Sequence, residues 1–160
     1  MLTGAGLAFW RSVRFRPVAD IALIDQTRVV TNGDHGRDKV DRRLVAVGAL
    51  LAGVAITLGA FGAHALKGRI GAEALGWWHT AVEYQMWHAL AVVGLGLSDS
   101  PRWQLPAWLF AGGTLVFSGT LYALALGAPR WLGAVTPLGG IALISGWMML
   151  AWRVRRAGGE

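Results

Sequence analysis

Four long apolar stretches, separated by short polar segments, organise the chain beyond residue 43. They cover about residues 44–66, 78–97, 105–126 and 131–152. A helix of about 20 residues, rising 1.5 Å per residue, crosses a hydrocarbon core about 30 Å thick, and each stretch is long enough to do so. Polar and apolar residues do not alternate in them, which disfavours membrane-spanning strands. The pattern therefore predicts an all-α fold, an integral membrane bundle of four transmembrane helices.

Short connections and an unequal charge distribution fix how the spans are arranged. Connections this short make sequence neighbours antiparallel. Positive side chains near span ends number eight on the side of both termini and three on the other side. Because cytoplasmic segments carry the excess of lysine and arginine, we expect both termini to be cytoplasmic. The eight are Arg37, Lys39, Arg42, Arg43, Arg102, Arg153, Arg155 and Arg156, and the three are Lys67, Arg69 and Arg130.

Side chains of two further kinds mark the spans. Tryptophan favours the membrane interface, and small residues let the backbones of membrane helices approach each other closely. We therefore expect interfacial indoles at the span ends and a small-residue packing face on the first span. The tryptophans are Trp77, Trp78, Trp103, Trp131 and Trp152, and the small residues are Gly48, Ala52, Ala55, Gly59 and Gly62.

Residues 1–39 differ from the rest of the chain. They combine charges of both signs with no helical period, so they are predicted to be a disordered extension of a four-helix domain over residues 40–156. An arginine-rich targeting peptide is an alternative, against which Asp20 and Asp25 argue. A second hypothesis is that the extension is spurious and that translation starts at Val40, which an intact-mass measurement would decide.

Composition limits the partners that the chain can have. The chain is 54% hydrophobic and 15% charged, with a net charge of +6 and no cysteine. The basic residues flank apolar spans instead of forming a stripe with interleaved aromatics, so we expect contact with membrane lipid and no binding of nucleic acid. The lack of cysteine excludes disulfides and thiolate chemistry.

The second span carries an unusual number of polar side chains. With Glu83 about 7 Å inside this span and His88 near the membrane midplane, an isolated charge would be costly. We therefore expect the Glu83 carboxyl group to be neutral, to pair with His79 or His64, or to face a water-filled cavity. The pairs His79–Glu83 and Tyr84–His88 are four residues apart and can touch on a helix. The full candidate cluster is His64, His79, Thr80, Glu83, Tyr84, Gln85 and His88.

Two interpretations of this cluster remain open at this point. It is either a proton relay, ion site or ligand site, or a set of interhelical hydrogen bonds. His64, His79, Glu83 and His88 offer nitrogen and oxygen ligands, but their spacing matches no metal motif, and we expect neither a metal nor another cofactor. No catalytic residue is assigned.

A proline interrupts the fourth span. Pro137 removes one backbone donor and clashes with the preceding turn, so a kink or local unwinding is expected at this point. Thr136 or a neighbouring helix would satisfy the freed carbonyl. The candidate kink comprises Thr136, Pro137, Gly139 and Gly140.

Four motifs together resemble a known family. They are GAFGAHAL at residues 59–66, TAVEYQ at 80–85, FSGTLYAL at 117–124 and TPLGG at 136–140. In this order they are similar to the small membrane proteins called domain of unknown function 423, related to transmembrane protein 256. The resemblance covers about residues 42–152 and implies a four-helix protein of the bacterial inner membrane. It brings no established activity, cofactor or catalytic residue.

Three functions remain open, in order of preference. The first is a non-enzymatic bundle with a structural role, or one that docks a partner, either in a homo-oligomer or with another membrane protein. The second is a small proton-coupled transporter or channel. The third is a membrane enzyme or a lipid- or quinone-binding protein that uses Glu83 and the histidines.

Overall fold

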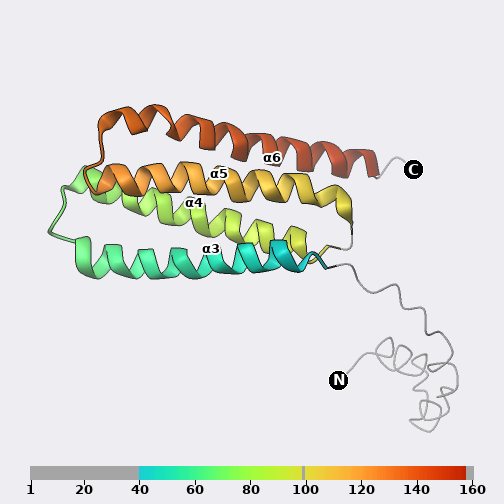
Figure 1. Cartoon of the computed structure of the whole chain (residues 1–160), viewed down its shortest axis with the longest axis horizontal. Coiled ribbons are helices and arrows are strands. Elements are labelled where there is room, and N and C mark those ends of the chain that lie inside the picture. The colour runs from blue at the N-terminus through green and yellow to red at the C-terminus, as the bar shows by residue number, and fades with distance from the viewer. Residues whose placement is uncertain (1–39, 99, 158–160) are drawn as a thin grey trace, which may run out of the picture. The chain divides into compact units, whose positions relative to one another are not determined.

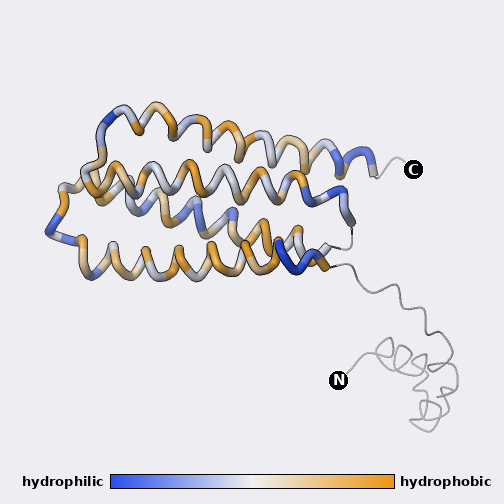
Figure 2. Tube along the Cα trace, in the orientation of Figure 1, coloured by the Kyte–Doolittle hydropathy of each residue, from blue (hydrophilic) through white to orange (hydrophobic). Residues whose placement is uncertain are grey.

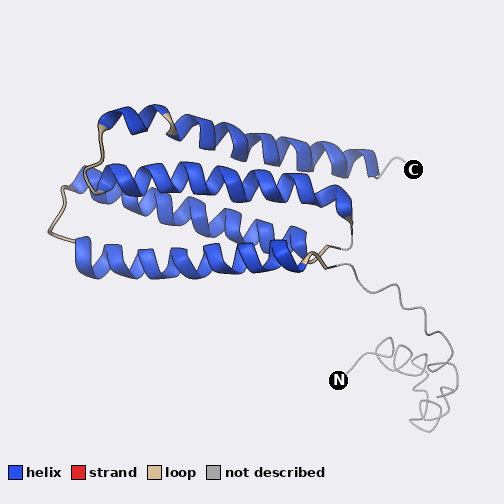
Figure 3. Ribbon diagram, viewed as in Figure 1, coloured by secondary structure: helices blue, strands red, loops and turns tan. Residues whose placement is uncertain are grey.

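The computed structural model describes residues 40–98 and 100–157, and these form four long α-helices (Figure 1). They are α3 (Arg42–Phe61), α4 (Ala72–Gly96), α5 (Gln104–Ala125) and α6 (Thr136–Ala157). Figure 3 shows helices joined by short loops throughout the described part. The all-α prediction is confirmed. The expectations for residues 1–39 lie outside the described residues.

Three of the helical segments are long and apolar enough to cross a membrane. They are Arg42–Leu66, Pro101–Ala125 and Arg130–Arg156. The helix α4 is also long enough, at 25 residues, but its polar side chains lower its hydropathy. Figure 2 shows hydrophilic colour within α4, whereas in α3 it gathers at the helix ends. Because α4 packs along both α3 and α5, it belongs to the same membrane bundle.

The first turns of α3 and α4 contain charged residues. In α3 the Asp41 carboxylate accepts hydrogen bonds from the backbone N–H groups of Arg43 and Leu44, at 3.1 and 3.2 Å. The helix α4 starts at Ala72, well before the span expected from Trp78, and Glu73 lies in its first turn. An acidic side chain at that position complements the helix dipole. A polar first turn therefore extends α4 beyond its apolar stretch.

The four helices form a diamond in which α4 and α5 are the central pair. The helix α3 packs along α4, α4 along α5, and α5 along α6. The outer helices α3 and α6 do not pack along each other within the described residues, and α3 reaches α5 at only a few points. Both outer helices therefore leave long apolar faces uncovered, as membrane helices can, because lipid tails are as apolar as leucine.

Glycines bring the helix axes close together at both ends of this diamond. A Cβ atom at Gly48 would lie 2.9 Å from the Ala89 carbonyl oxygen of α4. A Cβ atom at Gly139 would lie 2.4 Å from the Phe117 backbone nitrogen of α5, and one at Gly146 would clash with the Phe110 ring. These contacts leave no room for larger residues. The core between the helices consists of Leu44, Leu51, Ala89, Val92, Ala107, Phe110, Ala111 and Leu143.

The fourth apolar stretch is divided in two. A 3₁₀-helix covers Arg130–Ala134, and α6 begins only at Thr136. Pro137 is therefore in the first turn of a helix, where the missing N–H needs no partner. The Thr136 hydroxyl lies 2.9 Å from that of Thr120 on α5, which ties the start of α6 to its neighbour.

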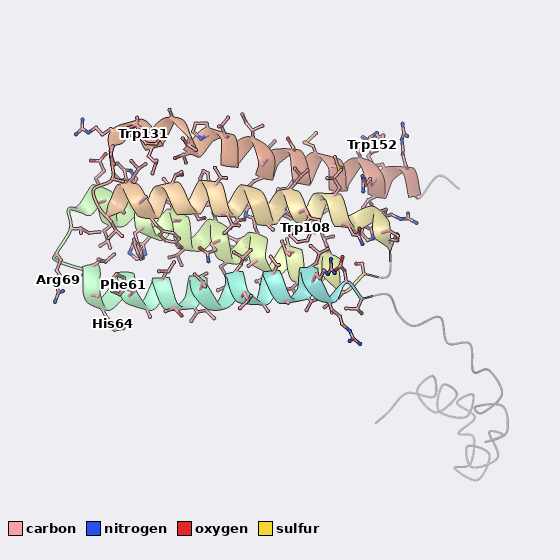
Figure 4. The ribbon with its side chains drawn as sticks, in the orientation of Figure 1. Phe61, His64, Arg69, Trp108, Trp131 and Trp152 are labelled. Atoms are coloured by element: carbon pink, nitrogen blue, oxygen red, sulfur yellow. The ribbon has the colours of Figure 1, made fainter. Side chains whose placement is uncertain are left out.

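Aromatic and charged side chains gather at the two ends of the bundle. Figure 4 shows Phe61, His64, Arg69 and Trp131 at one end and Trp152 toward the other. Trp131 is 66% exposed and Trp152 is 52% exposed, as expected of interfacial indoles. Trp78 is an exception among the tryptophans assigned to the interface. It is only 2% exposed and belongs to the core.

Candidate functional site

Gln85 joins three helices from the centre of the bundle. Its side chain is 4% exposed. Its Nε2 donates to the backbone oxygen of Leu51 on α3 at 2.8 Å, and its Oε1 accepts from the Tyr122 hydroxyl on α5 at 3.1 Å. Both ends of the amide are therefore used, which suits a polar group buried in hydrocarbon. Gln85 is an interhelical tie.

His88 connects α4 with α6 in a single protonation state. One ring nitrogen, Nδ1, lies 2.7 Å from the Tyr84 carbonyl oxygen, which can only accept, so Nδ1 must donate. The indole N–H of Trp147 can only donate, and it does so to Nε2 of His88 at 3.1 Å. Both contacts are satisfied only by the neutral imidazole with its proton on Nδ1. Neither nitrogen is left to pass a proton onward.

Trp78 packs against the C-terminal end of α3. Its indole N–H donates to the Leu58 carbonyl oxygen at 2.8 Å, and its ring lies 4.7 Å from that of Tyr122. A Cβ atom at Gly62 would come within 2.6 Å of the indole, so only glycine fits there. The chain of α3 continues from this point as a π-helix over Gly62–Leu66. Such a widened turn accompanies the loss of regular hydrogen bonding in many helices.

Two hydroxyls on α5 face the interior without a partner. The side-chain oxygens of Thr114 and Ser118 are buried and make no hydrogen bond within residues 40–98 and 100–157. Both residues are 1% exposed. Thr120, one turn beyond Val116, instead donates to that residue's carbonyl oxygen at 2.8 Å. By the helical repeat, Thr114 and Ser118 lie on the side of α5 that also carries Tyr122.

The opposite side of α4 is uncovered. We define the α4 outer face by Gly76, Glu83, Trp87, Leu90 and Gly94, which follow the helical repeat and are all exposed. Trp87 is 68% exposed and Leu90 is 53% exposed. Among the described residues, the hydrogen bonds made by α4 side chains come from the buried side, and none involves Glu83.

Glu83 lies near the middle of α4. Because α4 begins at Ala72, Glu83 is about 17 Å from the start of a helix about 37 Å long. The glycine contacts between α3 and α4 place it at the level of Thr57, inside the apolar segment Arg42–Leu66. The expected depth of about 7 Å was counted from Trp78, six residues after the helix starts. An unpaired carboxylate facing lipid there would cost several kcal/mol.

The predicted cluster is not one site. Gln85 and His88 point into the bundle, Thr80 is half-buried, and Tyr84 is 43% exposed with its ring stacked on that of His88. Glu83 and His79 lie on the exposed side of α4, and the exposed His64 lies at the end of α3 (Figure 4). The described ranges contain no group of three or more His, Asp or Glu side chains placed to hold a metal ion.

A shallow groove runs beside His88, between α4, α5 and α6. Its volume is about 420 Å³, and Tyr84, Phe117 and Trp147 form its aromatic walls. The Tyr84 and Phe117 rings are 4.7 Å apart. The histidine nitrogens at its floor already have partners, so the groove offers apolar surface and little free hydrogen-bonding capacity.

Sequence reasoning missed several partners in this network. Tyr122 and Trp147 are the side chains that complete the bonds of Gln85 and His88, and neither was a candidate. A signal was present, since Trp78, Gln85 and Val92 recur every seven residues and all three face the core. The partners on α5 and α6 come from other helices, which a helical repeat within α4 cannot identify.

Comparison with known proteins gives a consistent result. Residues 58–140 match the family described as protein of unknown function (DUF423). The chain is 42% identical over 111 residues to the UPF0382 membrane protein YwdK of Bacillus subtilis, covering 66% of this chain and 90% of that protein. It is 39% identical over 126 residues to the UPF0382 inner membrane protein YgdD of Escherichia coli, covering 72% and 95% respectively. No solved structure matches.

Proposed function

Because this chain belongs to the DUF423 family of small membrane proteins, whose molecular function is unknown, we propose a docking role for it in the membrane. In this proposal the bundle is non-enzymatic and binds a transmembrane helix of another protein against the α4 outer face. The bound helix carries a lysine, arginine or histidine at the depth of Glu83. The observation that carries the proposal is the exposed, unpaired position of Glu83 in the middle of α4.

A glutamate inside a membrane needs a polar partner. Acidic side chains inside membranes pair with other polar groups or face water-filled cavities. The interior hydrogen bonds of α4 are made by Trp78, Gln85 and His88, on the opposite side of the helix. A basic side chain on a docked helix would satisfy the carboxylate and add specificity, since charged groups select among partners more than they add affinity.

Glycines on the same face support close approach of a helix. A Cβ atom at Gly76 or at Gly94 would meet nothing within 4 Å in this chain. Neither glycine is therefore needed for packing inside the bundle, and glycine within a helix costs about 1 kcal/mol relative to alanine. Small residues at such positions are typical of contacts between membrane helices. The exposed Trp87 and Leu90 supply apolar contact area between them.

A different chain fits this face better than a second copy does. Two copies in one membrane share their orientation, so a symmetric pair would run α4 parallel to α4 and bring identical residues together. Glu83 would then face another Glu83, and Trp87 another Trp87. Like charges at one depth are unfavourable, whereas a basic partner is complementary. The proposal therefore commits to another membrane protein.

The bonds of His88 disfavour the proton-relay alternative. Glu83 and His88 lie on opposite sides of α4, and both nitrogens of His88 are occupied. No observation favours transport over docking.

We further propose that the protein lies in the bacterial inner membrane with both termini in the cytoplasm. In Figure 1 the start of α3, the start of α5 and the end of α6 lie at one end of the bundle. Arg42, Arg43, Arg102 and the arginines of α6 belong to these helix ends, whereas Lys67, Arg69 and Arg130 belong to the connections at the other end. Because the chain has no cysteine of its own, a thiol reagent labels this protein only at a cysteine that is introduced. In intact cells a membrane-impermeant thiol reagent should label Lys67→Cys and leave Arg43→Cys unlabelled. The reverse pattern would overturn this orientation.

Site-directed photo-cross-linking in native membranes tests the docking role. A photoreactive amino acid replaces Leu90 in the full chain, and the matched control replaces Leu115, which is 63% exposed on α5. We expect the Leu90 probe to give an adduct whose cross-linked peptide lies in a membrane-spanning segment that contains a basic residue. Glu83→Ala should reduce the yield of this adduct at least tenfold, because it leaves the partner's charge unpaired.

A reciprocal charge exchange completes the test. Glu83→Lys should abolish the adduct, and replacing the identified basic residue of the partner by glutamate should restore it. Adducts formed only with lipid, only with another copy of this chain, or with a segment that lacks a basic residue would each overturn the proposal.

A further inference from the structure

The last two turns of α6 form a groove that combines apolar and cationic surface. The groove has a volume of about 330 Å³ and is lined by Met148, Ala151, Trp152, Arg155 and Arg156. Met148 is 67% exposed and lies on the hydrocarbon side, whereas the arginines lie at the end of the helix. A single strip of α6 therefore leads from apolar surface to two guanidinium groups.

The cationic end of this groove is positioned by an aromatic ring. The guanidinium carbon of Arg156 lies 4.0 Å from the centroid of the Trp152 ring, within the range of a cation–π interaction. Figure 4 shows Trp152 near the C-terminal end of α6. Stacking leaves the N–H groups at the edge of the guanidinium free, because the interaction uses its planar face. Arg156 is thus prepared to bind an anion in the plane of the guanidinium.

The neighbouring arginine, Arg153, has a different contact. It donates a hydrogen bond to the backbone oxygen of Arg102, at the start of α5, and so is held against the bundle. Arg155 and Arg156 are exposed, and within the described ranges the acidic residues lie elsewhere: Asp41 caps α3, and Glu73 and Glu83 lie on α4. The two arginines therefore carry local positive charge that no acidic side chain of α6 offsets.

We propose that this groove binds one anionic phospholipid, with the phosphate between Arg155 and Arg156 and an acyl chain along Met148 and Ala151. Arginine suits phosphate because its planar fork donates two parallel hydrogen bonds. An anionic headgroup gains roughly 1 kcal/mol per nearby basic residue at a membrane surface. The apolar half of the groove favours a lipid over free inorganic phosphate, which shares the same anionic chemistry. This site is separate from the α4 outer face and does not depend on the docking role.

Native mass spectrometry of the full chain, released from nanodiscs of mixed phosphatidylcholine and phosphatidylglycerol, tests this site. We expect one phosphatidylglycerol molecule to remain bound. The double variant Arg155→Gln/Arg156→Gln should weaken its retention about 30-fold, because two basic contacts are lost. The control Lys67→Gln/Arg69→Gln removes the same number of charges at the other end and should retain the lipid.

Two further measurements test how the lipid is held. Trp152→Leu should weaken retention in part, because it removes the stacking that holds Arg156. Millimolar inorganic phosphate should not displace the lipid. Equal loss in both double variants, equal retention of phosphatidylcholine, or displacement by phosphate would each overturn the assignment of an anionic phospholipid site.

Discussion

Polar residues on α4 divide according to the side of the helix on which they lie. Gln85 bonds to α3 and α5, and His88 bonds to α6 and to the Tyr84 carbonyl oxygen of its own helix. Glu83, two residues before Gln85, has none engaged within the part of the chain that the structure describes. The first two therefore hold helices together, and in the docking proposal the third is the residue that the partner recognises.

Replacing Gln85 by leucine should destabilise the bundle by about 1–2 kcal/mol, because the buried Tyr122 hydroxyl loses its acceptor. The control is Glu83→Leu, which makes the same kind of change on the exposed side of α4 and should leave stability unaltered in detergent. Reversible denaturation of the purified protein, followed by circular dichroism, measures both. Equal losses would show that Glu83 also holds the fold together.

The helices α5 and α6 approach each other most closely at Gly139. At Gly139 the nearest atom to an added Cβ is the backbone nitrogen of Phe117, at 2.4 Å, and a backbone atom cannot rotate away. The hydroxyls of Thr120 and Thr136 fix the same interface near its end. The interface therefore depends on a single small residue at its tightest point.

At this interface Gly139→Ala should cost about 1–3 kcal/mol, since α6 must move away from α5. Gly119→Ala on α5 is the matched control, because its Cβ would meet nothing within 4 Å. There the better helix propensity of alanine should raise stability by up to about 1 kcal/mol. Thermal unfolding in one detergent compares the two variants. A neutral Gly139→Ala would mean that the helices pack less closely than described.

The element boundaries show where sequence reasoning reached its limit. Hydropathy located the four spans because an apolar stretch of this length has few other uses. It placed Trp78 at an interface because the polar first turn of α4, which includes Glu73, did not resemble a helix inside a membrane. It could not separate the inward Gln85 from the outward Glu83. In a membrane both the core side and the lipid side of a helix are apolar, so amphipathicity is weak.

At the scale of the molecule, the diamond distinguishes this bundle from a closed ring of four helices. The outer helices α3 and α6 each pack along one neighbour, α3 along α4 and α6 along α5. The faces of α4 and α5 that point away from the core are left open, and one of them carries Glu83. An open arrangement suits a protein that binds other helices, because the contact surface is available without unfolding any part of the bundle.

Paired cysteines test this arrangement in a chain that has none of its own. Thr120→Cys/Thr136→Cys should form a disulfide between α5 and α6, since the native hydroxyls are 2.9 Å apart. Leu50→Cys/Ile144→Cys, on the exposed sides of α3 and α6, should not form one within a protomer. Gel mobility under non-reducing conditions reports both pairs. An intramolecular disulfide between residues 50 and 144 would indicate a closed ring.

The way in which α3 is held affects how freely its sequence can change. Gln85 and Trp78 both donate to main-chain oxygens of α3, at Leu51 and Leu58. Every amino acid carries that acceptor, so these two bonds do not depend on which side chain occupies either position. Substitutions in α3 should then leave these two bonds intact unless they add a larger side chain toward α4. A substitution at Gly48 or Gly62 would do so. No compensating change in α4 would be required to keep these bonds, and apolar replacements of similar volume at residues 51 and 58 should remain largely folded.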